Sequence, residues 1–253
     1  MIFGALAAGA ILFSVSDPAA DALGDGGYVL PVAKADVSQL DIRTFSAIDN
    51  HGKLELRLQM GRISNPDQAP NGFSRPVIDV FIGTGRGGVS TLGNSGFTTR
   101  ANSGWYYHIR ATPFAVMLRR DSSADYVQLP KNRTAQAKVE GSSIVIQTDI
   151  PASDYTYYAI SSLYDSLTPT GIAQPQSEPS ALKLLSPLED APSALDIVFE
   201  NRQILLWATR EVPPLNEPQL GLNPLLFTGL AGFIILLVTT IWGFFTPQRD
   251  TWR

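Results

Sequence analysis

In Leu54-Glu55-Leu56-Arg57-Leu58-Gln59-Met60, an apolar side chain stands at every second position. Because the side chains of a β-strand point alternately to opposite faces, this period is typical of a strand that is buried on one face. Similar patterns occur at 77–82, 105–112, 114–120, 143–148 and 155–162. No ten-residue segment before residue 193 has a helical period. The alternation therefore predicts a domain built from strands.

Turn-forming residues separate these predicted strands. The gaps contain Asn50-His51-Gly52, Pro70-Asn71-Gly72, Asn102-Ser103-Gly104, Glu140-Gly141 and Pro169-Thr170-Gly171. Many short strands joined by Gly, Asn and Pro are typical of an antiparallel sandwich. We therefore predict an all-β fold, an immunoglobulin-like antiparallel β-sandwich, over residues 17–192.

The C-terminal part of the sequence has the composition of a membrane anchor. Residues 224–245 contain no charged side chain. A helix needs about 20 apolar residues to cross the hydrocarbon core of a bilayer. Trp242 and Phe245 stand near the end of this stretch, where aromatic rings favour the headgroup layer. The sequence predicts one C-terminal transmembrane helix at 224–245 and a short cytoplasmic tail at 246–253.

The first residues resemble a secretory signal. Residues 1–13 are apolar but too short to span a bilayer, and Ser14 and Ser16 are the small residues that a signal peptidase reads. We predict a signal peptide at 1–16, cut before Asp17. No Lys or Arg precedes Lys34, so either the start lies upstream or the α-amino group supplies the positive charge. Together with the anchor, this places the sandwich outside the cytoplasm, held by a single-pass helix at the cell membrane.

Between the predicted sandwich and the anchor, residues 193–223 are rich in proline, which favours an extended stalk. Within this segment, Leu195–Trp207 is an apolar run. It fits either a last hairpin of the domain or a helix on the bilayer surface. We favour the hairpin, because residues 200–203 have the composition of a turn.

Composition and motifs exclude several functions. The sequence has no cysteine, so a thiolate metal site and a thiol nucleophile are excluded, and its net charge of −4 disfavours nucleic acid as a partner. Residues 83–88 match G-x-G-x-x-G, but the residues that follow do not form the helix that a dinucleotide site needs. No zinc-protease or serine-hydrolase motif occurs. We predict no catalytic residues and no enzymatic activity.

Two groups of residues are candidates for binding. Tyr106, His108 and Arg110 alternate on one face of a predicted strand, and Tyr155 and Tyr157 do so on another. Aromatic rings and planar polar groups on a rigid sheet are typical of sugar sites. We predict these five residues as the ligand-binding set, the alternative being that they are ordinary core and surface residues.

The acidic segment at the start of the predicted domain is a candidate metal site. Asp17, Asp21 and Asp25 stand among glycines and small residues. Ca²⁺ binds 6–8 oxygens from carboxylates and carbonyls in flexible loops. We predict a calcium site at these three residues; the alternative is an acidic tether without a bound ion.

Six short motifs, in this order, resemble the C-terminal binding module of glucodextranases. They are D-P-x-x-D-x-x-G-D-G-G-Y at 17–28, L-D-I-R-T-F at 40–45, N-G-F-S at 71–74, V-I-D-V-F-I at 77–82, G-W-Y-Y-H-I-R at 104–110 and Y-x-Y at 155–157. The resemblance covers roughly residues 17–192. It implies a β-sandwich related to the DOMON group of sugar- and haem-binding domains, and a non-catalytic module associated with glycans or the cell envelope. No hydrolase domain is attached here, so the glucan substrate does not carry over.

These observations lead to a functional hypothesis with two alternatives. We expect a membrane-anchored, extracytoplasmic, non-catalytic module whose partner is an envelope polysaccharide or another glycan. The first alternative is a structural subunit that docks onto other membrane-protein subunits. The second is a haem-binding electron-transfer domain, for which Met60, Met117 and His108 are the available ligands. We expect no haem, because Met60 aligns with the apolar face of its strand.

Overall fold

Strands make up most of the regular structure in the computed structural model, which describes residues 9–24, 26–31, 36–121, 134–178, 183–200 and 203–217. The strands are β1 Ala10–Ser16, β2 Ile42–Asn50, β3 Lys53–Met60, β4 Pro76–Gly83, β5 Thr98–Thr99, β6 Tyr107–Ala111, β7 Val116–Arg120, β8 Ala135–Glu140, β9 Ser143–Pro151, β10 Thr156–Leu163, β11 Ala194–Ile197 and β12 Glu211–Val212. A 3₁₀ turn, Val37–Gln39, precedes β2, and helix α1, Ile204–Thr209, lies between β11 and β12.

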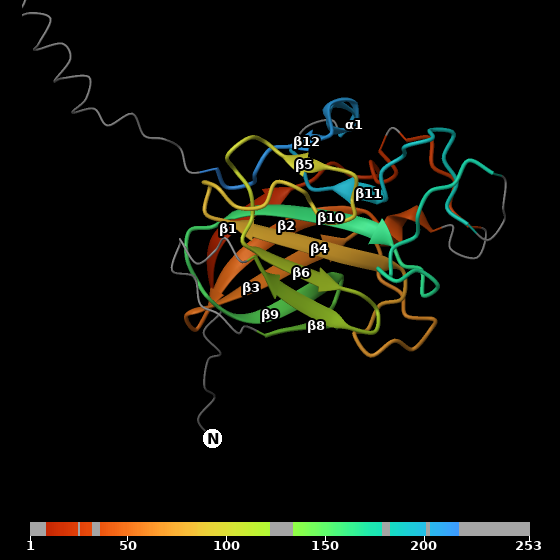
Figure 1. The fold of residues 1–253 in the computed structure, drawn as a ribbon. Helices are drawn as coiled ribbons and strands as arrows, with labels where there is room; N and C mark the ends of the chain where they lie inside the picture. Colours follow the sequence, from red (N-terminus) through yellow and green to blue (C-terminus); the bar gives the residue numbers. More distant parts are fainter. Residues whose placement is uncertain are drawn as a thin grey trace, which may run out of the picture. The chain divides into compact units, whose positions relative to one another are not determined.

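The strands form two five-stranded antiparallel sheets (Figure 1). The first sheet has the order β1-β2-β3-β9-β8, and the second has the order β11-β10-β4-β6-β7. A short parallel pair, β12 with β5, stands apart from them. The two large sheets pack against each other, so the prediction of an all-β antiparallel sandwich is confirmed.

Local sequence explains the strands and turns that were predicted. Each of the six segments with alternating polarity overlaps a strand, namely β3, β4, β6, β7, β9 or β10. The β2–β3 hairpin turns at His51 and Gly52, whose φ angles are 55° and 80°. Positive φ at both central residues matches the right-handed twist of the flanking strands, and Asn-Gly-like sequences tolerate it best. The Asn50-His51-Gly52 turn is therefore confirmed.

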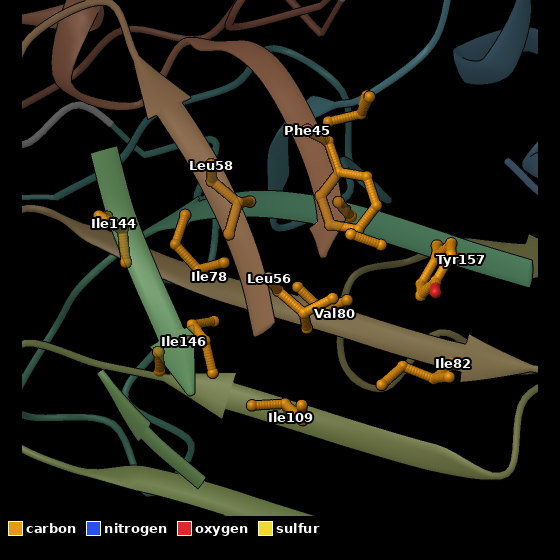
Figure 2. Close-up of a cluster of buried hydrophobic side chains, with 14 of the residues drawn as sticks. Phe45, Leu56, Leu58, Ile78, Val80, Ile82, Ile109, Ile144, Ile146 and Tyr157 are labelled. Carbon is orange, nitrogen blue, oxygen red and sulfur yellow. The ribbon is translucent and has the colours of Figure 1, made fainter. Parts of the chain in front are cut away.

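An apolar core fills the space between the two sheets (Figure 2). Leu54, Leu56 and Leu58 of β3 are completely buried there, on the face that the alternation predicts. Opposite them, β4 contributes Ile78 and Val80. The apolar residues of the period-2 pattern thus form this core.

The other face of the second sheet is also covered. Every residue of β4 and β10 is buried, so neither face of these two strands meets solvent. Phe81 and Tyr158 point away from the inter-sheet core and join a second apolar cluster with Leu195 and Trp207. The N-terminal loop, long loops and the segment that contains α1 supply this cluster. The domain therefore has a third layer, which the alternation does not predict.

The N-terminal boundary of the sandwich differs from the prediction. Ala10–Ser16 forms β1, which pairs with β2 at the edge of the first sheet. The ring of Phe13 stacks on Tyr157 with the centroids 6.1 Å apart. Cleavage before Asp17 would remove this strand, so the structure does not support the predicted signal peptide at 1–16 over residues 10–16; residues 1–8 lie outside the described ranges.

The first part of the predicted stalk, where a last hairpin was expected, has regular structure. Residues 194–197 form β11, which pairs with β10, and the following apolar residues form α1 instead of the second strand of a hairpin. Leu206 and Trp207 of this helix are buried in the second apolar cluster. Among the described residues, the helices are too short for a bilayer crossing. The predicted transmembrane helix at 224–245 lies outside them.

The inter-sheet core gives a direct stability prediction. Leu56→Ala should lower the free energy of unfolding by about 2–5 kcal/mol, because it removes buried methyl groups and leaves a cavity. Leu167→Ala is the control, since Leu167 is 91% exposed and its loss should change stability by less than about 0.5 kcal/mol. Urea unfolding of both variants measures the difference, and equal losses would contradict the assignment of the core.

Candidate functional site

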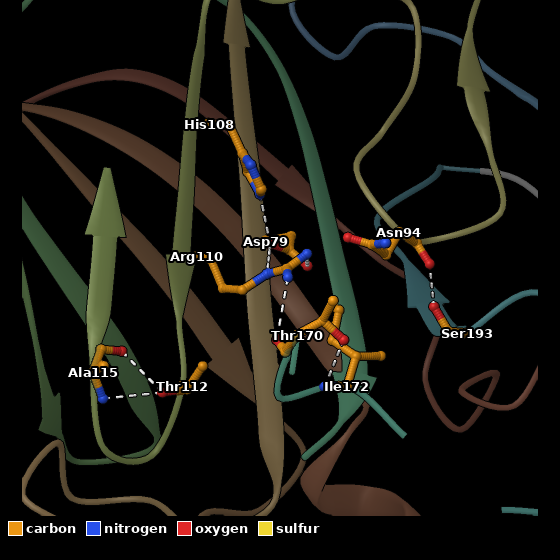
Figure 3. Close-up of polar contacts among 9 residues, drawn as sticks. All are labelled: Asp79, Asn94, His108, Arg110, Thr112, Ala115, Thr170, Ile172 and Ser193. Atoms are coloured by element: carbon orange, nitrogen blue, oxygen red, sulfur yellow. Dashed lines mark hydrogen bonds and ion pairs between the residues drawn. The ribbon is translucent and has the colours of Figure 1, made fainter. Parts of the chain in front are cut away.

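The residues predicted to face a ligand on β6 instead bond to one buried carboxylate (Figure 3). Arg110 donates from Nε to Oδ1 of Asp79 at 2.7 Å and from Nη2 to Oδ2 at 3.1 Å. His108 Nε2 lies 2.6 Å from the same Oδ1. Because a carboxylate only accepts, the proton of the imidazole must lie on Nε2. Asp79 therefore receives three hydrogen bonds from two basic side chains.

This network is part of the fold's interior. Burial alone would raise the pKa of Asp79, but the hydrogen bond from His108 and the charge of Arg110 outweigh it and hold this pKa below its ordinary value. The His108 ring also stacks on Phe81, with the centroids 4.2 Å apart. His108 is 4% and Arg110 7% exposed, so their side chains offer little surface to a ligand. Arg110 also donates from Nη1 to the carbonyl of Thr170 at 3.3 Å, which joins the sheet to the loop that follows β10.

The three predicted tyrosines are buried as well. Tyr157 is fully buried in the inter-sheet core, and Tyr155 lies beside it with the ring centroids 6.5 Å apart. Tyr106 is 5% exposed and donates its hydroxyl to the carbonyl of Arg86 at 2.8 Å. No face of these rings is open for stacking on a sugar. The structure thus places Tyr106, Tyr155 and Tyr157, which were predicted to form a sugar platform, inside the fold.

Two of the candidate haem ligands, Met60 and His108, lie on opposite sides of the second sheet. Met60 is 1% exposed and belongs to the core between the sheets. His108 lies on the opposite face of the second sheet and is bonded to Asp79. Met117 is opposite Arg110 in the β6–β7 pair. A Met60–His108 ligand pair is therefore incompatible with this fold, because a whole sheet separates the two side chains.

An exposed aromatic notch lies at one end of the second sheet. Its cavity has a volume of about 340 Å³ and is lined by Asp67, Arg75, Phe114, Tyr164 and Ser166. The rings of Phe114 and Tyr164 are 5.8 Å apart and inclined by 42°. Phe114 is 51% exposed, so one face of its ring is available to a ligand. Arg75 and Asp67 pair at 3.1 Å on the same wall.

The residues that line this notch come from three loops. Phe114 lies in the β6–β7 turn, where the Thr112 hydroxyl accepts from the backbone amide of Ala115 at 2.9 Å (Figure 3). Tyr164 follows β10, and its amide donates to the carbonyl of Arg75 at 2.8 Å. Because both anchors are hydrogen bonds from backbone amides, the aromatic pair stands on a preformed frame. Sequence reasoning missed the notch because its residues come from separate loops.

A cluster of carboxylates lies beside the third layer. The structure brings Asp17 and Asp21 together with Asp196 of β11, and a carboxylate oxygen from each lies within 4.8 Å of the others. The third predicted calcium ligand, Asp25, lies outside the described residues. Asp196 was missed because it is far away in sequence, although a charged residue inside the apolar run at 195–198 is itself a signal of a special role.

The cluster has little positive charge to balance it. Burial and the charge of Asp196 raise the pKa of Asp17 to about 9, and burial together with neighbouring carboxylates raises the pKa of Asp196 to about 8. Gln203 donates its side-chain amide to Asp21 at 2.9 Å and also to Asp196. This amide neutralises no charge. In the absence of a cation, burial and the mutual repulsion of these carboxylates therefore favour their protonated form.

Comparison with known families gives one match. The family described as the C-terminal binding module, SLH-like, of glucodextranase matches residues 12–203. A search of curated proteins found no match. The matched range runs from β1 to the residue before α1, so it includes both sheets and the carboxylate cluster.

The Asp79 network yields a prediction that distinguishes it from surface ion pairs. Asp79→Asn should destabilise the fold by about 3–5 kcal/mol, because it leaves Arg110 buried without a counter-charge. Glu217→Gln is the control, since it breaks a pair with Arg100 in which both side chains are 55% exposed. Such a pair contributes at most about 1 kcal/mol. Denaturant unfolding at pH 7 gives both values.

The same network has a defined pH dependence. Folding lowers the pKa of Asp79. The contribution of its charge to the free energy of unfolding is therefore fully present above the ordinary pKa of 3.8, and it is lost as the pH falls through the folded-state pKa. The stability difference between the wild type and Asp79→Asn should therefore shrink only below about pH 4. A difference that is already small at pH 7 would contradict the ion-pair assignment.

Proposed function

Because this chain belongs to the family of glucodextranase C-terminal binding modules, we propose that it is a non-catalytic module that binds carbohydrate at the cell envelope. The family match over residues 12–203 is the observation that carries this proposal.

The aromatic notch is the part of the surface that best suits a sugar. Sugar rings present patches of C–H groups that pack on aromatic faces, while their hydroxyls bond to planar polar groups. Phe114 supplies an open ring, and the Arg75–Asp67 pair supplies donors and acceptors beside it. The cavity of about 340 Å³ is at the small end of ligand sites, which suits one or two sugar units. We assign glycan contact to this notch in place of the buried tyrosines.

The second part of the proposal concerns location. The uncharged stretch at 224–245 is long enough to cross a bilayer, and Arg249 and Arg253 follow it. We propose that this stretch anchors the module as a single-pass helix, with residues 246–253 in the cytoplasm and the sandwich outside. Such an anchor suits a module that holds an envelope polysaccharide near the membrane.

Glycan binding is tested with the full-length chain in detergent. Affinity electrophoresis through gels that contain dextran or isolated envelope polysaccharide should show retardation of the wild type. Phe114→Ala should raise the dissociation constant roughly tenfold, which corresponds to about 1.4 kcal/mol. Leu188→Ala, at an apolar residue that is 46% exposed outside the notch, should bind like the wild type.

The outcome also separates the module from its main alternative. If no glycan retards the protein while a membrane-protein complex co-purifies with it, the chain is a structural subunit and the carbohydrate proposal fails. If glycan binding survives Phe114→Ala unchanged, the ligand binds outside the notch.

Membrane anchoring has its own test. Replacing Ile235 and Leu236 together by Arg should release the chain from the membrane fraction, because each Arg costs about 2.5–3.5 kcal/mol at the centre of a spanning helix. The control replaces Gln248 by Arg, outside the apolar stretch. Alkaline carbonate extraction of cell membranes measures the distribution, and a wild-type chain in the soluble fraction would refute the anchor.

A further inference from the structure

Three segments that are distant in sequence meet at the carboxylate cluster. Asp17 follows β1, and its amide donates to the carbonyl of Arg43 at 3.0 Å, which continues the pairing with β2. Asp21 lies in the loop that follows, and this loop bonds to β11 through the Leu23 amide and the Leu195 carbonyl at 2.6 Å. The cluster is thus the junction of the first sheet, the N-terminal loop and the edge of the second sheet.

Several oxygens in this junction lack a donor. Asp17 accepts from the Phe199 amide at 2.6 Å through Oδ1, but its Oδ2 has no hydrogen-bond partner among the described residues. The same holds for Oδ1 of Asp21 and Oδ1 of Asp41. Asp17 is 7% and Asp41 1% exposed, so these oxygens are also shielded from solvent. A buried carboxylate oxygen without a partner is costly unless a proton or a cation satisfies it.

The charges in the junction do not balance. Four carboxylates act on one another there, because the charges of Asp21, Asp41 and Asp196 all bear on Asp17. The ion pair found among them joins Arg43 to Asp41 at 2.6 Å. Three negative charges therefore remain to be neutralised when all four groups are ionised. A divalent cation would remove most of this excess.

We propose that Asp17, Asp21 and Asp196 bind a calcium ion, with Asp41 beside them. Ca²⁺ lies 2.3–2.6 Å from its oxygen ligands, so two oxygens that share it are at most about 5 Å apart. One oxygen from each of the three carboxylates lies within 4.8 Å of the other two, which satisfies this limit. Calcium also accepts irregular geometry, whereas Mg²⁺ demands a near-ideal octahedron. This ligand set takes Asp196 from β11 and needs no contribution from Asp25.

The surroundings give the ion a route and a rigid support. A cavity of about 320 Å³, lined by Pro18, Asp21 and Gln203 among others, opens beside the cluster. Water ligands and the entering ion fit this space. On the far side of the loop, a Cβ at Gly24 would lie 2.5 Å from the Trp207 ring, so the loop packs closely on α1. The ion would therefore fasten the N-terminal loop and α1 to the edge of the second sheet.

The test uses the full-length chain after treatment with a chelator. Calorimetric titration with CaCl₂ should show one ion per chain, and thermal unfolding in CaCl₂ at a hundredfold excess over the dissociation constant should give a melting temperature about 5–10 °C above that in EDTA. Asp21→Asn should weaken binding at least tenfold. Asp190→Asn, which changes an exposed acid elsewhere, should leave both values unchanged.

A second variant protects the test against misfolding. Asp17→Asn should also lose the calcium-dependent shift, and far-ultraviolet circular dichroism checks that both variants keep the strand content. Equal melting temperatures in CaCl₂ and EDTA, with no heat of binding, would overturn the proposal. So would a full calcium shift in both variants, because the ion would then bind elsewhere.

Discussion

Burial of the second sheet on both faces is the constraint on which the rest of the structure depends. Because β4 and β10 meet no solvent, the sheet needs a third layer, and loops with little regular structure supply it. Asp79 lies on the outer face of this sheet, whereas Asp196 of the edge strand β11 lies opposite Ser161 on the inner face, and both carboxylates are buried. Each buried charge then has to be paired, protonated or bound to a cation.

The two buried acidic sites meet this requirement in different ways. The guanidinium of Arg110 neutralises the charge of Asp79, and the imidazole of His108 bonds to the same carboxylate. The charge of Asp79 is therefore balanced without a ligand. The junction of Asp17, Asp21 and Asp196 accepts hydrogen bonds from the amides of Gln203, Phe199 and Ile42, but among the described residues these three carboxylates form no ion pair. The Asp79 network lies in the middle of the second sheet, beneath the third layer. The carboxylate cluster lies at the edge of this sheet, where the proposed calcium ion neutralises its charge.

The sequence alone allowed prediction of the elements whose period is local. Residues 54–60 show the alternation of β3, and the inter-sheet core follows from it. Residues 10–16 were predicted as part of a leader and the β11–α1 segment as part of a stalk with a last hairpin, because their short apolar runs fit those elements, whereas tertiary packing decides their state. The candidate binding residues depend most on tertiary structure. Tyr157 and His108 have the composition of a ligand face, but Tyr157 is buried in the inter-sheet core and His108 beneath the third layer, whereas Phe114 and Tyr164 meet only through the fold.

Fastening of the third layer by the carboxylate junction is the central claim of this account, and hydrogen exchange measured with mass spectrometry tests it most directly. The full-length chain is compared in CaCl₂ and in EDTA. We predict slower exchange in CaCl₂ at residues 17–24 and 194–199, with β3 and β9 unchanged, because the ion joins the first two segments and lies outside the inter-sheet core. Identical exchange in the two buffers at residues 17–24 and 194–199 would contradict the claim.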